Sequence, residues 1–192
     1  MPRWPENTRA RLVDAAFGMF VEQGYAGTTV EQIATRAGAT SRTFFRHFRD
    51  KDEVLFADDD ELLPHLVESI AGSTAGDSGG MMRAALGALA DRMEPGRPRL
   101  RQRQRIIEQD VGLTGRELAK QARWQHAVVD ALLERGFDRD DAEILAAIGF
   151  ALFTGALHEW LEGEDDDGRS LRDHVERRFP KIADALNRPV PS

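Results

Sequence analysis

Hydrogen-bond donors and cations gather in the segment 40–51, and their types suit contact with DNA. Arginine is the usual bidentate partner of guanine in the major groove, and a basic side chain also binds phosphate. The side chains expected to reach base edges are Ser41, Arg42, Thr43 and Arg46, and those expected near phosphates are Arg46, His47, Arg49 and Lys51. Thr40 is also expected at the DNA interface, and Thr29 is expected to contribute through free N–H groups at a helix start. A solvated, charged helix face is the alternative interpretation, and His47 could equally well pack.

Two short helices joined by a glycine-containing turn would position these donors. Thr28 and Glu31 have the Ser/Thr-x-x-Glu spacing of a capping box, which marks a helix start. Apolar residues then recur at helical spacing until a glycine ends the pattern, and Thr40 or Ser41 caps the next helix. The segment 28–47 is therefore predicted to be a helix-turn-helix, whose second helix enters the major groove.

The rest of the sequence also has helical periodicity and no sustained alternation of the kind that strands show. The predicted fold is all-α, with a three-helix DNA-binding domain over residues 1–50 and a helical ligand-binding and dimerisation body over residues 51–192. Pro64 and Pro180 lie within helical patterns, so a kink or a break is expected at each. Besides the helix-turn-helix, helices are expected at residues 8–22, 51–58, 62–70, 81–93, 100–109, 117–135, 141–161 and 171–186.

Charge and composition narrow the class of protein further. The net charge of −7 argues against indiscriminate nucleic-acid binding, yet residues 1–51 hold eight basic and five acidic side chains. This distribution favours an anionic partner at the N-terminal end alone. The chain has no cysteine, which excludes disulfides and thiolate metal sites, and no metal or cofactor is expected. The first seven residues lack the apolar core of a signal peptide, so the expected location is cytoplasmic.

The residues around the predicted helix-turn-helix resemble a known family. The stretches that carry the resemblance are Gly24–Val30, Ile33-Ala34, Ala37-Gly38, Thr43–Phe48 and Lys51–Leu55, and they look like the N-terminal domain of TetR-family regulators. The resemblance implies a homodimer that binds double-stranded, near-palindromic operator DNA and releases it when a small molecule binds the body. It thus implies a ligand-responsive regulator that acts as a repressor, and it does not exclude an activator. No membrane partner is expected.

One departure from the family concerns Phe45. The family often has a tyrosine there, whose hydroxyl touches a phosphate, and phenylalanine lacks that hydrogen bond. Phe45 is therefore expected to contribute packing or van der Waals contact at the DNA surface.

The effector is expected among the helices of residues 81–161, where polar side chains interrupt apolar helix faces. The body is similar to that of an actinobacterial branch of the family whose members sense acyl-CoA-like ligands, which implies a hydrophobic or acyl-CoA-like effector. The arginines between Arg97 and Arg105 would then either bind a ligand phosphate or form a solvated face. The residues considered for effector contact are Trp124, Gln125, His126 and His158, for which satisfied core or surface positions are the alternative.

The last two long helices are expected to form the dimer interface. Helix 141–161 is apolar nearly all round, as an element buried on two sides should be, and its apolar run is too short to span a bilayer. Completing a monomeric core is the alternative role. The interface residues expected are Ala147, Ala151 and Gly155, which permit close helix approach, and Leu171, Val175, Phe179 and Ile182 on the final helix.

An enzyme is the competing class of function, namely a helical body whose pocket turns over a substrate. The sequence has no nucleophile elbow, phosphate-cradling glycine loop or His-Glu-x-x-His pattern. We therefore predict that the protein is not an enzyme. A DNA-binding protein with no effector is the third hypothesis.

Overall fold

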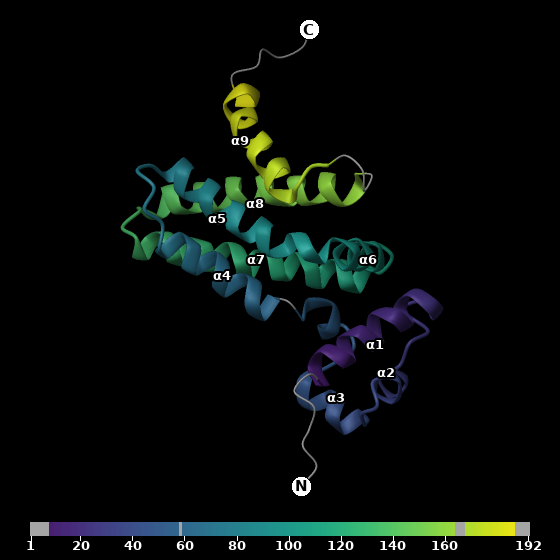
Figure 1. The fold of residues 1–192 in the computed structure, drawn as a ribbon. Coiled ribbons are helices and arrows are strands. Elements are labelled where there is room, and N and C mark those ends of the chain that lie inside the picture. Colours follow the sequence, from purple (N-terminus) through teal and green to yellow (C-terminus); the bar gives the residue numbers. More distant parts are fainter. Residues whose placement is uncertain (1–7, 58, 164–167, 187–192) are drawn as a thin grey trace. The chain divides into compact units, whose positions relative to one another are not determined.

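The computed structural model describes residues 8–57, 59–163 and 168–186. Every regular element within these residues is helical, which confirms the predicted all-α class (Figure 1). The α-helices are α1 (Thr8–Gln23), α2 (Val30–Arg36), α3 (Ser41–His47), α4 (Asp59–Ala71), α5 (Ser78–Met93), α6 (Arg97–Glu108), α7 (Val111–Glu134), α8 (Arg139–Glu162) and α9 (Leu171–Leu186), with 3-10 turns η1 (Glu53–Phe56) and η2 (Glu94–Gly96).

The chain divides into two compact units. The N-terminal unit comprises residues 1–60 together with 102–117, and the body unit comprises residues 61–101 together with 118–192. The predicted boundary at residue 50 therefore falls short of the N-terminal unit and omits its second segment. That segment belongs there because Ile106, Ile107 and Leu113 are buried in the same apolar cluster as α1–α3.

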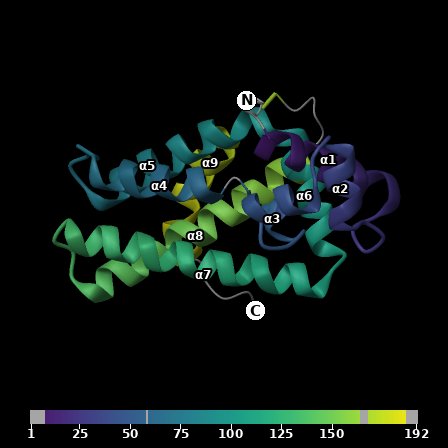
Figure 2. The ribbon, with the colours of Figure 1, turned by 90° about the horizontal axis from the view of Figure 1, so that it is seen from below.

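Helices α1, α2 and α3 lie together in the N-terminal unit (Figure 2). Their buried side chains include Leu12 and Ala16 of α1, Ile33 of α2 and Phe44 of α3, each at most 1% exposed. The turns between the helices need a left-handed backbone, which Gly24 and Gly38 adopt with φ of 81° and 63°. The tight helix-turn-helix geometry thus follows from the apolar spacing and these two glycines.

The start of α2 corrects the predicted capping box by one residue. Thr29, and not Thr28, is the N-cap, and it exchanges hydrogen bonds with Gln32, and not with Glu31. The hydroxyl of Thr28 instead donates to the carbonyl of Gly24 at 2.8 Å, and the residue is buried. Two adjacent threonines followed by adjacent Glu and Gln fit the motif in either register, and burial of Thr28 selects the second one.

Substitutions in the capping box should separate the two registers. We expect Thr29→Ala to destabilise the N-terminal unit by about 1 kcal/mol, because the N-cap hydroxyl accepts a backbone hydrogen bond at the start of α2. Gln32→Ala should cost part of that amount and Glu31→Ala almost nothing. Thermal unfolding followed by circular dichroism measures all three. A larger loss for Glu31→Ala than for Gln32→Ala would contradict the observed register.

The segment after α3 differs from the predicted helix 51–58. It forms only the short 3-10 turn η1, whose first N–H donates to Asp50 Oδ1 at 2.8 Å, and α4 begins at Asp59. Helix α4 continues through Pro64, and α9 continues through Pro180, so neither proline ends its helix. Proline removes one backbone hydrogen bond, and the remaining turns of both helices hold the element together.

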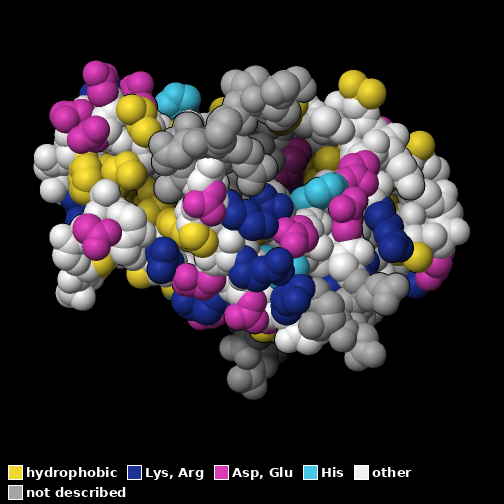
Figure 3. All heavy atoms as spheres, turned by 90° about the horizontal axis from the view of Figure 1, so that it is seen from above, with side chains coloured by type: hydrophobic (Ala, Val, Ile, Leu, Met, Phe, Trp, Pro, Cys, Tyr) yellow, Lys and Arg dark blue, Asp and Glu magenta, His cyan; other side chains and the backbone are white. Residues whose placement is uncertain are grey.

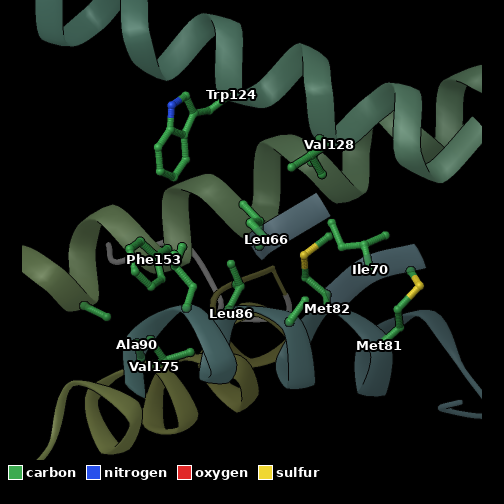
Figure 4. Packing of buried hydrophobic residues seen from close by; sticks show 14 of the residues in the cluster. Leu66, Ile70, Met81, Met82, Leu86, Ala90, Trp124, Val128, Phe153 and Val175 are labelled. Carbon is green, nitrogen blue, oxygen red and sulfur yellow. The ribbon is translucent and has the colours of Figure 1, made fainter. Parts of the chain in front are cut away.

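Helices α4, α5, α7, α8 and α9 build the core of the body unit. Figure 4 shows Leu66, Ile70, Met82 and Leu86 gathered between these helices, and all four are at most 4% exposed. Met82 packs so closely against Gly149 of α8 that a Cβ there would lie 2.9 Å from its sulfur. The apolar residues that recur at helical spacing in this part of the sequence therefore pack mainly into the core of the body unit.

Two arginines of α9 attach it to the neighbouring helices in the same manner. The guanidinium of Arg172 lies across Gly87 of α5 and pairs with Asp91, one turn further on. The guanidinium of Arg178 lies across Gly155 of α8 and pairs with Glu159 at 3.0 Å, again one turn further on. Basic and acidic side chains are interspersed on the face shown in Figure 3, as such pairs require.

Helix α8 is long and apolar enough to cross a membrane by length and composition, contrary to the expectation from its apolar run. The core helix of a soluble protein passes the same test. One side of α8 has that role here, because Ala142, Ala146 and Ala156 are fully buried in the body core.

Candidate nucleic-acid interface

Helix α3 is held in place by its cap and by one buried face. The Thr40 hydroxyl accepts a hydrogen bond from the N–H of Thr43 at 3.2 Å, which confirms Thr40 as the N-cap. The Thr43 hydroxyl lies 3.1 Å from that of Thr40, and the residue is only 6% exposed. The prediction that Thr43 lies on the exposed reading face is therefore wrong, because the third residue of α3 points into the unit.

The opposite face of α3 presents a cationic and apolar surface. Arg42 and Arg46 are exposed, Ser41 is half-buried, and Phe45 is 55% exposed. The Phe45 ring stands edge-on against Phe44, with centroids 5.6 Å apart. A large aromatic ring left in water beside two arginines is suited to van der Waals contact with DNA, as the sequence predicts for this position.

His47 ends α3 in a partly buried position. Its Nε2 atom is buried and has no hydrogen-bond partner within the described part of the chain. Burial, helped by the positive charges of Arg46 and Arg9, lowers the pKa of His47 below its ordinary value. Burial thus disfavours the charged imidazolium in the protein without DNA, which weakens the case for His47 as a cationic phosphate ligand.

Lys51 has partners within the chain, which changes its predicted role. Its ammonium donates to the carbonyls of Tyr25 at 2.8 Å and Thr28 at 3.1 Å, and it lies 4.1 Å from the centroid of the Tyr25 ring. These contacts hold the loop that leads into α2. The expected phosphate contact of Lys51 is at most its second role, because two of its three N–H groups are already used.

Sequence reasoning missed the arginines that brace the helix-turn-helix. Arg36 of α2 donates two hydrogen bonds to the carboxylate of Glu22, and Arg11 of α1 donates to the carbonyl of Ala37 at the turn. The guanidinium of Arg36 lowers the pKa of Glu22 chiefly by hydrogen bonding. Arg11 lies outside the helix-turn-helix, and the partner of Arg36 lies on α1, so the spacing of residues within the motif gave no signal of either contact.

The structure separates the residues predicted for effector contact. Trp124 is 8% exposed within the body core and Gln125 is half-buried. His126 is exposed and bonds the carbonyl of Ala122 in its own helix, and His158 is exposed and pairs with Glu162 at 3.2 Å. The two histidines thus lie at exposed positions, whereas Trp124 lies in the body core.

Three residues predicted for the dimer interface are covered within one chain. Leu171 and Val175 are 0% exposed, because they pack into the body core, and Gly155 lies under Arg178 of the same chain. Phe179 is half-buried beneath the guanidinium of Arg83, and Ile182 is half-buried. Ala147 and Ala151 are exposed on α8, on the same side as Ile144, which is 56% exposed. Of the predicted set, the two alanines are thus the residues most open to a partner.

Two arginines of α6 donate to backbone carbonyls of the body unit. Arg97 donates to the carbonyls of Trp160 and Gly163, and Arg101 donates to those of Leu161 and Gly163, at 2.7–3.1 Å. Both therefore satisfy carbonyl groups at the C-terminal end of α8. Arg97 and Arg101 are thus engaged within the chain, whereas Arg105 of the same run is exposed.

Comparison with known proteins places this geometry in a family. Residues 12–57 match the family model described as bacterial regulatory proteins, tetR family. The chain is 32% identical over 175 residues to the HTH-type transcriptional regulator TcmR of Streptomyces glaucescens, covering 85% of this chain and 77% of TcmR. It is 27% identical over 172 residues to the HTH-type transcriptional activator FasR of Mycolicibacterium smegmatis, covering 85% and 76%.

The fold agrees with that of solved structures. The structure of SmeT, the repressor of the multidrug efflux pump SmeDEF of Stenotrophomonas maltophilia, aligns with a TM-score of 0.61 at 24% identity, covering 97% of this chain and all of SmeT. The SmeT-triclosan complex aligns with a TM-score of 0.65 over the same shares. The helix-turn-helix, the helical body and the match to TcmR together show that this chain belongs to the TetR family and is a DNA-binding transcriptional regulator, not an enzyme.

Proposed function

We propose that the protein is a homodimeric, cytoplasmic repressor that binds a near-palindromic operator through α3 and leaves it when a small hydrophobic effector binds the body unit. The exposed face of α3 is the observation that carries the DNA-binding part. Arg42, Phe45 and Arg46 are exposed there, while Phe44 fixes the helix from its buried side. A recognition helix needs a buried face that fixes its position and an exposed face whose side chains can donate hydrogen bonds to DNA.

The proposed effector is hydrophobic rather than a phosphate-bearing acyl-CoA. Arg97 and Arg101 already donate to backbone carbonyls, so they are not placed to bind a ligand phosphate. Trp124 and Gln125 remain as the proposed effector contacts among the predicted residues. SmeT has the same fold, and its structure in complex with triclosan supports a small-molecule effector for this protein.

Selection of bound duplexes from random DNA, followed by a release screen, tests the whole proposal. We expect enrichment of a near-palindromic sequence, and release by hydrophobic small molecules more readily than by acyl-CoAs. Failure to enrich any sequence would refute operator binding. Enrichment without release by either class of compound would support the DNA-binding protein with no effector.

Arg42→Ala provides the sharpest test of the interface. We expect it to weaken operator binding by about 1–3 kcal/mol and to relax base preference at one or two positions, because a bidentate arginine reads guanine. Arg123→Ala removes the same charge from an exposed site on α7 and serves as the control. Fluorescence anisotropy with the selected duplex and its single-base variants measures both effects. Equal, sequence-independent losses in the two variants would contradict base readout by Arg42.

A further inference from the structure

We propose that Arg116 is a positioning residue for operator binding, because a chain of polar contacts runs from it to the loop that begins α2. The inference rests on the proposed DNA interface and assigns a role to a residue outside the helix-turn-helix. Arg116 lies near the start of α7, in the second segment of the N-terminal unit. All the contacts described below, which link Arg116 to the start of α2, are between residues of that unit.

The first step joins Arg116 to two carboxylates that follow α3. Its Nη1 atom lies 2.8 Å from Asp50 Oδ1 and 2.9 Å from Asp52 Oδ2. Burial alone would raise the pKa of Asp50, but the hydrogen bond from Arg116, helped by backbone N–H groups, holds it below its ordinary value. Asp50 also accepts the N–H of Glu53 and so begins η1. Arg116 therefore fixes the backbone turn directly after α3.

The second step passes from Asp52 to the loop before α2. The Tyr25 hydroxyl donates to Asp52 Oδ1, so one carboxylate oxygen binds the tyrosine and the other binds Arg116. Lys51 then packs on the Tyr25 ring and donates to the carbonyls of Tyr25 and Thr28. Thr28 immediately precedes the N-cap of α2.

These contacts form a network that reaches the proposed DNA interface at two places, the turn after α3 and the loop before α2. Arg116 touches the turn that follows α3 directly and reaches the start of α2 through Asp52 and Tyr25. An isolated surface ion pair contributes little, whereas linked charges that share a carboxylate are coupled to one another. Loss of Arg116 should therefore leave the fold intact and loosen the relative placement of the two helix ends that face DNA.

Operator affinity across a salt series tests this role. We expect Arg116→Ala to weaken binding about fivefold, which lies within the range of coupling between groups in one network. The dependence of affinity on salt should stay unchanged, because a positioning residue releases no counterion from DNA. Arg123→Ala, on the same helix and equally cationic, should change affinity much less. Circular dichroism verifies that each variant keeps its helices.

A double-mutant cycle tests the route through Asp52. Asp52→Asn alone should weaken binding, and adding Arg116→Ala should weaken it much less than fivefold further. Full additivity would overturn the Asp52 step of the proposal. If Arg116→Ala matches Arg123→Ala while Arg42→Ala loses affinity, the positioning role fails and the DNA interface stands. If Arg42→Ala also loses nothing, the interface itself is wrong.

Tyr25 supplies a spectroscopic readout, because it is the only tyrosine in the chain. Burial first, and then its hydrogen bond to Asp52, raise its pKa above the ordinary value. Absorbance of the tyrosinate should therefore develop at higher pH in the wild type than in Asp52→Asn, whose phenol should titrate closer to about pH 10. Retained helicity at the same pH is the control. Identical titrations in the two proteins would overturn the Asp52–Tyr25 step.

Discussion

Ala151→Arg is expected to convert the proposed dimer into a monomer and to remove tight operator binding with it. Ala151 is exposed near the middle of α8, on a side that also exposes Ile144 and Ala147. If this face pairs with its copy in a dimer, an arginine at position 151 would be buried without a partner. A two-fold symmetric interface would bury two such arginines, one from each protomer. Two half-sites bound together gain about 10²–10⁴-fold in avidity, so the loss on separation should be of that order.

Sedimentation at micromolar concentration and anisotropy with the operator measure the two parts of this effect. Ala84→Arg is the matched control, since Ala84 is an exposed alanine in the middle of α5. It should leave mass and affinity near those of the wild type. A wild-type protein that sediments as a monomer yet binds the operator fully would refute the dimer, and a dimeric Ala151→Arg variant would refute this face.

The helix-turn-helix could be predicted because local signals there agree with one another. Gly24 and Gly38 mark turns that require a positive φ, and the apolar spacing between them matches one buried helix face. The capping register was ambiguous only because Thr28 and Thr29 both fit, and tertiary burial made the choice. The burial of Thr43 could not be predicted because a threonine can face the interior once its hydroxyl has a partner, which here is the hydroxyl of Thr40.

The body was harder to predict because an apolar helix face does not say which neighbour covers it. Leu171 and Val175 have the spacing of an interface, yet α9 packs them into the core of its own chain. Gly155 permits close approach, yet Arg178 of the same chain takes that space. The partner of an arginine or a lysine is equally hidden, because a long side chain reaches groups far away in sequence, as Lys51 and Arg116 do.

Arg103→Met should be the most destabilising of the proposed substitutions in the N-terminal unit. The guanidinium donates to the carbonyl of Leu55 at 2.7 Å, pairs with Glu117 and lies 4.9 Å from the centroid of the Phe56 ring. Its side chain is only 13% exposed and that of Glu117 only 17%. Removing the arginine leaves a carboxylate and a carbonyl without their cation in a poorly solvated place, at a cost of about 3 kcal/mol.

Hydrogen exchange of the slowest amides in α1–α3 measures this loss where it arises. Arg105→Met, an exposed arginine of the same helix, should change exchange little and serves as the matched control. The double variant Arg103→Met with Glu117→Leu should recover part of the stability, because the carboxylate with which Arg103 pairs is then replaced as well. The decisive observation is the order of the variants. If Arg103→Met exchanges like Arg105→Met, the contacts of α6 with η1 do not support the N-terminal unit. If it exchanges much faster, the contacts of Arg103 with η1 and Glu117 contribute to the stability of α1–α3.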